Sequence, residues 1–211
     1  MRHTPTEKPL KNLDWPINRL ERIEKEPTTR KILKESIKIL ILSSIISSIG
    51  GISIEAARVK LFALLPFLIM LPALNDMIGD FGTIVASKFT VLLYQKRIKR
   101  HEWWKGAAVH HLFMTVSSVA LIASLFMATL AYAIAWIRGF AFEPILFAKL
   151  VGISLFATLF LVLIIFAVSI IGGLYVHKKG HDPDNYLIPL ATGIADFGSM
   201  LVLGIVLRWL F

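Results

Sequence analysis

The chain has 211 residues, 56% of them hydrophobic, with a formal net charge of +9 and no cysteine. Its mean hydropathy of +0.70 excludes a soluble domain of this size, and the absence of cysteine excludes disulfides and thiolate metal sites. The basic residues gather in polar segments beside apolar stretches, so the charge indicates membrane topology and nucleic acid is not needed as a partner.

The first 34 residues are polar and basic, and they contain no apolar core typical of a signal peptide. Leu20 and Ile23 lie among charged residues, a pattern that favours a helix at a membrane surface. We therefore expect residues 1–34 to form a short cytoplasmic amphiphilic arm, and residues 35–211 to form a transmembrane domain.

Five apolar segments are long enough to cross a bilayer, which takes about 20 residues of helix. They are Ser36 to Ala57, Leu61 to Leu93, Val109 to Ile137, Pro144 to Val176 and Tyr186 to Leu210. None shows the alternation of a barrel strand. The sequence predicts an all-α integral membrane protein with five transmembrane helices in contact with membrane lipids.

Lys and Arg gather before the first span, in the segment 95–105 and after His177. By the positive-inside rule these segments are cytoplasmic, which places the N-terminus inside and, after five crossings, the C-terminus outside. We expect a multi-pass protein of the plasma membrane.

The second span is too long for one straight crossing. Pro72, Gly79 and Gly82 lie in it near its acidic residues. Proline removes a backbone donor and clashes one turn back, so we expect a kinked or locally unwound helix here.

Carboxylates interrupt this span at Asp76 and Asp80, and Thr83 and Ser87 share their helix face. A second polar stripe follows in the fifth span, where Thr192, Asp196 and Ser199 are three or four positions apart. An ionised Asp at the bilayer centre costs roughly 3 kcal/mol, so such residues usually face a bundle interior or a water-filled path.

The fifth span is preceded by Asp182, Pro183 and Asp184. Asp before Pro is typical of a helix N-cap, and Asp184 suits the positive end of the helix dipole. Attraction of cations to a cytoplasmic mouth by Asp182 and Asp184 remains the alternative.

All candidate ligands in the two stripes carry oxygen, which suits Mg²⁺, and also Mn²⁺ or Ca²⁺. The predicted cation-binding residues are Asp196, Asp80, Asp76, Asn75, Thr192 and Thr83. A ligand role also stays open for Glu55, Ser87 and Ser199, although Glu55 lies near the end of the first span, where an interface residue is more typical than a ligand.

None of the spans repeats another's motif, so a complete two-sided pore requires a second copy. Small residues would allow close helix approach at Ala73, Gly79, Gly82 and Ala86 in the second span, and at Ala191, Ala195 and Gly198 in the fifth. We expect a parallel homodimer whose interface is built by the second and fifth helices.

Two separate motifs resemble the MgtE magnesium transporters and solute carrier family forty-one. They are PALNDMIGDFGTIVASKFT from Pro72 to Thr90 and DPDNYLIPLATGIADFGS from Asp182 to Ser199. The resemblance covers residues 35–211. It implies a five-helix cation-transport domain, a magnesium path along the second and fifth helices at a two-fold interface, and a key pore carboxylate that corresponds to Asp196.

The sequence departs from this family at Gly79-Asp80, where the family usually has Gly-Asn, and the added charge leaves ion selectivity open. Glu55 falls near a first-helix acidic position of related chains. Bacterial relatives carry large cytoplasmic magnesium-sensing domains, whereas this chain has only its short arm. The resemblance therefore implies no gating mechanism here.

We expect a transporter rather than an enzyme, with Mg²⁺ as the transported ion and no organic cofactor. Two alternatives stay open at this point. One is a Mg²⁺-dependent membrane enzyme acting on lipid phosphates, although the Arg and Lys clamps expected beside its carboxylates are missing. The other is a non-transporting membrane scaffold whose Asp groups are satisfied internally.

Overall fold

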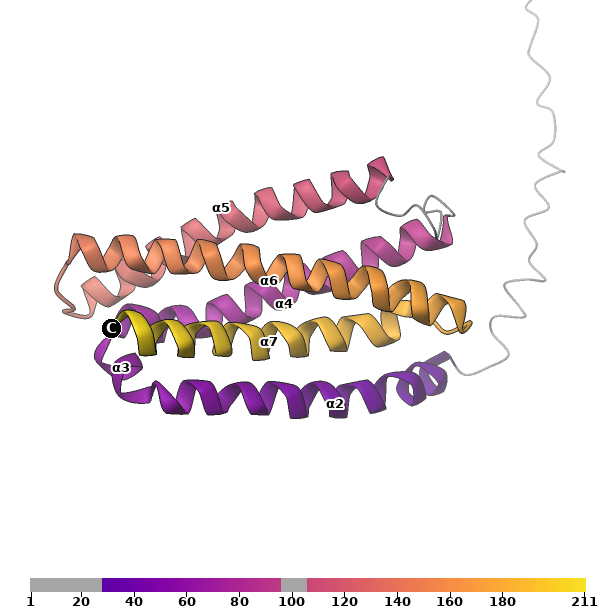
Figure 1. The fold of residues 1–211 in the computed structure, drawn as a ribbon, viewed down its shortest axis with the longest axis horizontal. Coiled ribbons are helices and arrows are strands. Elements are labelled where there is room, and N and C mark those ends of the chain that lie inside the picture. Colours follow the sequence, from indigo (N-terminus) through magenta and orange to yellow (C-terminus); the bar gives the residue numbers. More distant parts are fainter. Residues whose placement is uncertain (1–27, 96–105) are drawn as a thin grey trace, which may run out of the picture.

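The computed structural model describes residues 28–95 and 106–211, and this part of the chain is almost entirely helical (Figure 1). Five helices are long and apolar enough to cross a membrane. The elements are α2 (Thr28–Ala56), α3 (Arg58–Ala63), α4 (Leu65–Tyr94), α5 (Ala107–Ile137), α6 (Pro144–Lys178) and α7 (Pro183–Leu210). The predicted all-α membrane fold is confirmed.

The predicted second span differs from the observed helix at its start. Residues 58–63 form the separate short helix α3, and Leu64 leaves the helical region with φ −106° and ψ 74°. Pro66 lies in the first turn of α4, where its missing N–H costs no hydrogen bond. The chain therefore turns at residues 57–64 before it re-enters the bundle.

Helix α4 continues without interruption through Pro72, Gly79 and Gly82. Local unwinding, one of the two forms expected for this region, is not observed. Within a helix, proline removes one donor and crowds the carbonyl four residues earlier, and the flanking turns keep their hydrogen bonds. A kink within a continuous α4 stays a prediction.

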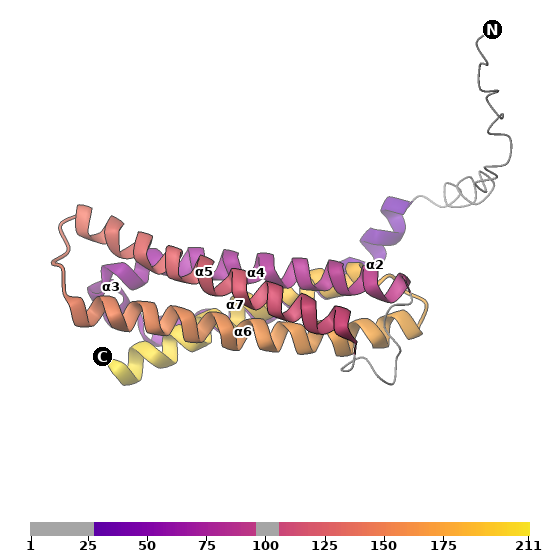
Figure 2. The same ribbon diagram turned by 90° about the horizontal axis from the view of Figure 1, so that it is seen from above.

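Helix α4 packs against three other long helices, α5, α6 and α7, and runs along the bundle with them (Figure 2). Its fully buried side chains Leu74 and Ile78 belong to one apolar cluster with residues of α6 and α7. A second cluster joins Phe89 to side chains of α5 and α6. Since lipid tails are as apolar as these side chains, close packing holds these helices together.

Small residues serve this packing inside one chain. Gly79, Gly82 and Ala86 of α4 are buried, and a Cβ on Gly82 would lie 3.0 Å from that of Ala191 on α7. Ala73 of the same set is exposed. Gly79 and Gly82, two of the small residues expected at a homodimer interface, therefore face α7 of the same protomer, whereas Gly198 of α7 lies against Leu161 of α6.

Helix α2 lies at the edge of the bundle and packs mainly on α7 (Figure 1). Only 11% of its most apolar 18-residue window is buried, against 39–44% for the other spans. The backbones of α2 and α7 approach closely at two glycines of α7. A methyl group on Gly193 would collide with Ser43, and one on Gly204 would collide with Ser53.

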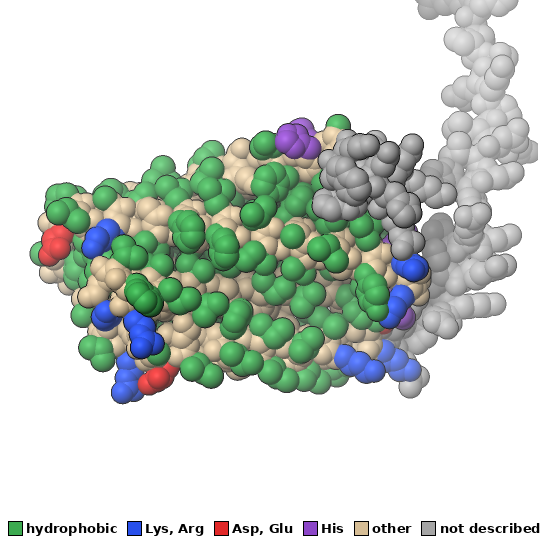
Figure 3. Space-filling model, viewed as in Figure 1, with side chains coloured by type: hydrophobic (Ala, Val, Ile, Leu, Met, Phe, Trp, Pro, Cys, Tyr) green, Lys and Arg blue, Asp and Glu red, His purple; other side chains and the backbone are tan. Residues whose placement is uncertain are grey.

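The face of the bundle seen in Figure 3 is largely hydrophobic between its two ends, and Lys and Arg lie at both ends of it. The start of α2 and the end of α7 are at opposite ends of the bundle (Figure 1). Which end faces the cytoplasm stays a prediction. Residues 28–34 of the predicted arm are helical and continuous with the first span, while Leu20 and Ile23 lie outside the described residues.

Candidate functional site

Asp196 lies near the middle of α7 and is half-buried against α2. The hydroxyl of Ser47 on α2 donates to its Oδ2 over 3.2 Å. Thr192, one turn earlier, is exposed and donates to the backbone oxygen of Ile188 over 3.1 Å. The carboxylate thus has one protein donor and an otherwise open side.

That open side is a groove of about 500 Å³ between α2 and α7, which we call the α2–α7 groove. It is lined by Leu40, Ser43, Ser44, Ser47, Ser48, Ile188, Pro189, Thr192 and Asp196. Sequence reasoning placed Asp196 and Thr192 at a site but missed the four serines. Their signal is a Ser-Ser pair repeated four residues later within a helix of Ile and Leu.

The two carboxylates of α4 have surroundings that differ from those of Asp196. Asp76 and Asp80 are exposed, and within the described residues neither takes part in a hydrogen bond or an ion pair. Thr83, half-buried, donates to the backbone oxygen of Gly79 over 3.2 Å. Ser87 is also half-buried. This stripe forms an open acidic face on one protomer.

One side-chain hydrogen bond joins the polar stripes of α4 and α7, between the Ser199 hydroxyl and Asn75 Oδ1. The buried Ser199 hydroxyl also lies 2.7 Å from the backbone oxygen of Ala195. Thr192 approaches α4 as well, since a Cβ on Gly79 would meet its methyl group at 3.8 Å. Asn75, Thr192 and Ser199 thus belong to the α4–α7 contact.

The structure does not gather the predicted acids into one site. Among residues 28–95 and 106–211, no group of three or more His, Cys, Asp or Glu side chains is placed to hold a metal ion. A cation at Asp196 or at Asp76 and Asp80 would therefore need water, hydroxyl or backbone oxygens, or a second protomer, to complete its ligands.

The start of α7 confirms the predicted cap. Asp182 is the N-cap, its Oδ1 accepts from the backbone N–H of Asp184 over 3.2 Å, and Pro183 is the first helical residue. Next to it, Glu35 of α2 accepts from Asn185 Nδ2 over 2.9 Å and lies 3.2 Å from His181 Nδ1. These contacts fix the first helix to the α6–α7 turn.

Glu55 lies at the opposite end of α2, exposed and paired with Arg58 over 3.3 Å. Its position is that of an interfacial ion pair, well apart along α2 from Ser47 and Asp196. Such exposed pairs contribute about 0–1 kcal/mol to stability.

Comparison with known families gives one match. The model of the family MgtE, described as divalent cation transporter, matches residues 71–206. This range begins within α4 and ends within α7, and it contains both acidic stripes and the turn that carries Asp182. Neither a curated protein nor a solved structure matches the chain.

Proposed function

The chain belongs to the MgtE family of divalent cation transporters, and from this membership we propose that it carries Mg²⁺ across the plasma membrane. The match covers more than half of the chain and includes every carboxylate of the two stripes. Because the family consists of transporters, the enzyme alternative is excluded. The fold is that of a multi-pass membrane protein, as transport requires.

The exposed carboxylates of α4 carry the proposal. Asp76 and Asp80 lie in a membrane-spanning helix without a partner in the described part of the protomer. Facing lipid, each ionised group would cost roughly 3 kcal/mol. A water-filled path at an interface with a second copy removes that cost, and it places negative charge where a cation passes.

A parallel homodimer provides such a path. A two-fold axis beside α4 and α7 would bring two copies of Asp76, Asp80 and Asp196 around one passage. Asn75, Thr83 and Thr192 would add neutral oxygens to it. Asp182 and Asp184 at the start of α7 would attract cations to the cytoplasmic mouth.

The ligand chemistry favours hard cations such as Mg²⁺ over zinc, copper and nickel. The path offers carboxylate, amide and hydroxyl oxygens, which suit hard cations, and Mg²⁺ often retains waters when only one or two carboxylates bind it. With an inside-negative potential, inward movement of a divalent ion gains about 4.6 kcal/mol per 100 mV. Uptake then needs no coupled ion.

Flux into liposomes holding the purified protein tests this function. Mg²⁺, Mn²⁺ and Ca²⁺ are compared for the wild type, for Asp196→Asn and for Glu143→Gln as a control. Glu143 is an exposed residue at the start of α6, away from both stripes. We expect saturable Mg²⁺ flux that Asp196→Asn abolishes and Glu143→Gln preserves. Undiminished flux in Asp196→Asn would remove this carboxylate from the path.

Disulfide crosslinking tests the interface, and the natural chain lacks cysteine, which gives a clean background. Ala73→Cys places a thiol on the exposed α4 face near Asp76, whereas Ile122→Cys places one on α5, where Ile122 is 70% exposed. In native membranes, oxidation should give a dimer for Ala73→Cys and none for Ile122→Cys. A monomeric active species would contradict the homodimer.

A further inference from the structure

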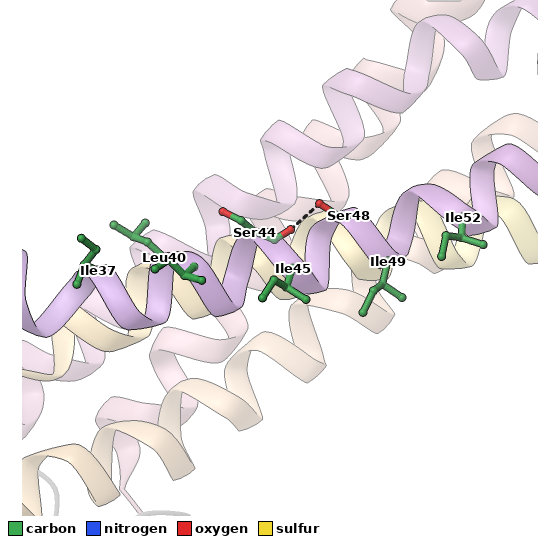
Figure 4. A pocket seen from close by; sticks show the side chains of 8 residues that line it. Ile37, Leu40, Ser44, Ile45, Ser48, Ile49 and Ile52 are labelled. Atoms are coloured by element: carbon green, nitrogen blue, oxygen red, sulfur yellow. Dashed lines mark hydrogen bonds between the residues drawn. The ribbon is translucent and has the colours of Figure 1, made fainter.

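The two sides of α2 differ in chemistry. Ser44 and Ser48 lie along one side of α2 and Ile45 and Ile49 along the other, and all four border one hollow on the outer face of this helix (Figure 4). The serine side continues into the α2–α7 groove, where Ser43 and Ser47 also lie. Serine is common at close contacts between membrane helices, and Ser43 packs on Gly193 in this way. Ser44 and Ser48 are exposed, so packing of this kind does not account for their hydroxyls.

The hydroxyl protons in this groove are already used. Ser43 Oγ donates to the Pro189 carbonyl over 2.7 Å, and Ser48 Oγ donates to the Ser44 carbonyl over 2.8 Å. Ser47 donates to Asp196 over 3.2 Å. The Thr192 proton likewise goes to a backbone oxygen. Four of the five hydroxyls therefore retain only lone pairs for a further partner.

A groove lined in this way accepts hydrogen bonds and positive charge. Its charged group is the Asp196 carboxylate, and no Lys, Arg or His lines it. An anion would meet lone pairs and a negative charge, whereas a cation, or a water bound to one and donating outward, would meet matching acceptors. The chemistry thus selects cations.

The size is also adequate. A water molecule occupies about 30 Å³ in the liquid, so a cation with six waters fills roughly 200 Å³. The groove offers about 500 Å³. A divalent cation that keeps most of its hydration therefore fits beside Asp196 without rearrangement of α2.

We infer that the α2–α7 groove is a cation-binding site in which Ser47 positions the Asp196 carboxylate and the other hydroxyls of α2 accept from the ion's waters. The inference rests on the proposed function, because it assigns to the first helix a wall beside the pore carboxylate. Ser47 is a positioning residue: its bond to Oδ2 fixes the carboxylate while leaving Oδ1 for the ion.

Thiol labelling distinguishes a water-filled groove from one filled by lipid. In membranes, Ser44→Cys and Ile45→Cys are treated with a charged methanethiosulfonate that reacts only where water reaches the thiol. Ile45 is the matched control, since it is adjacent on α2, exposed, and on the isoleucine side.

We expect Ser44→Cys to react, Ile45→Cys to remain unlabelled, and Mg²⁺ to slow the reaction of Ser44→Cys. Two results would overturn the inference: an unreactive Ser44→Cys, which means that lipid fills the groove, or labelling that Mg²⁺ leaves unchanged, which means that the groove holds water but no cation.

Flux measurements separate positioning from packing. Ser47→Ala should raise the Mg²⁺ concentration for half-maximal flux roughly tenfold, because a hydrogen bond to a charged group is lost. Ser47→Thr restores the hydroxyl and should return the value towards wild type. Ser53→Ala is the control, an α2 serine packed on α7 at Gly204 and outside the groove.

The outcomes distinguish the two proposals. If Asp196→Asn abolishes flux while Ser47→Ala keeps the wild-type concentration dependence, transport stands and the positioning role of Ser47 falls. If Asp196→Asn retains undiminished flux, Asp196 is not part of the path and the assignment of the α2–α7 groove falls with it. An equal loss in Ser47→Ala and Ser53→Ala would reduce the effect of Ser47 to helix packing.

Discussion

Asp196 on α7 and the pair Asp76 and Asp80 on α4 are carboxylates within membrane-spanning helices, yet they differ in burial and in hydrogen bonding within one protomer. Asp196 is half-buried, takes a hydrogen bond from Ser47 and borders a groove closed on one side by α2. Asp76 and Asp80 are exposed and form no such bond within the described residues. A single chain thus supports one carboxylate and leaves two to be satisfied from outside.

After the complete loss of flux expected for Asp196→Asn, the next largest effect is expected from the unsupported pair Asp76 and Asp80. In Asp76→Asn/Asp80→Asn, two charges leave the proposed path while side-chain size is kept, and liposome Mg²⁺ flux should fall at least about tenfold. Thermal stability in detergent should stay equal to wild type or rise, because neither carboxylate has a partner to lose. Wild-type flux in this variant would show that the α4 face is not part of the path. The two groups of carboxylates would then not share a function.

A smaller effect is expected where α2 supports the Asp196 side. Gly193→Ala drives a methyl group into Ser43, so we expect a loss of about 1–3 kcal/mol in stability, measured as a lower unfolding temperature in detergent. Gly51→Ala is the matched control on α2, since nothing lies within 4 Å of its added Cβ. Equal unfolding temperatures for the two variants would mean that α2 can shift on α7 at little cost.

The smallest effect concerns the bond that connects the two regions. Ser199→Ala removes the hydrogen bond to Asn75 and should cost about 1 kcal/mol. A double-mutant cycle with Asn75→Ala measures the coupling between the two side chains. Additive losses would show that the stripes of α4 and α7 are energetically independent despite this contact.

Much of the fold could be predicted from the sequence because hydropathy and length determine where helices cross a bilayer. The Asp182 cap was equally readable, since Asp-Pro at a helix start has a local cause. The separate helix α3 was missed because its last three residues, Leu61, Phe62 and Ala63, are apolar enough to continue the following span. The turn at Leu64 depends on how α2 and α4 are connected in space.

The site was only partly predictable for a related reason. A charged residue within an apolar segment is recognised from the sequence without knowledge of the fold, so Asp76, Asp80 and Asp196 could be predicted as candidates. The serines of α2 gain significance only when α2 lies on α7, because single hydroxyls are tolerated in any membrane helix. The close approach of Gly82 to Ala191 within one protomer likewise follows from the packing of α4 on α7.

The contact between α2 and α7 also has a consequence for how the protein is made. Ser43 and Pro189, which are hydrogen-bonded across it, are 146 positions apart. At synthesis rates of about 5–20 residues per second, the first span waits roughly 7–30 s for its partner to be made. During that interval its hydroxyls lie in the membrane without α7, and the groove beside Asp196 comes into existence only when the final helix has inserted. Helix α2, the first of the described helices, is thus among the last to reach its native neighbour.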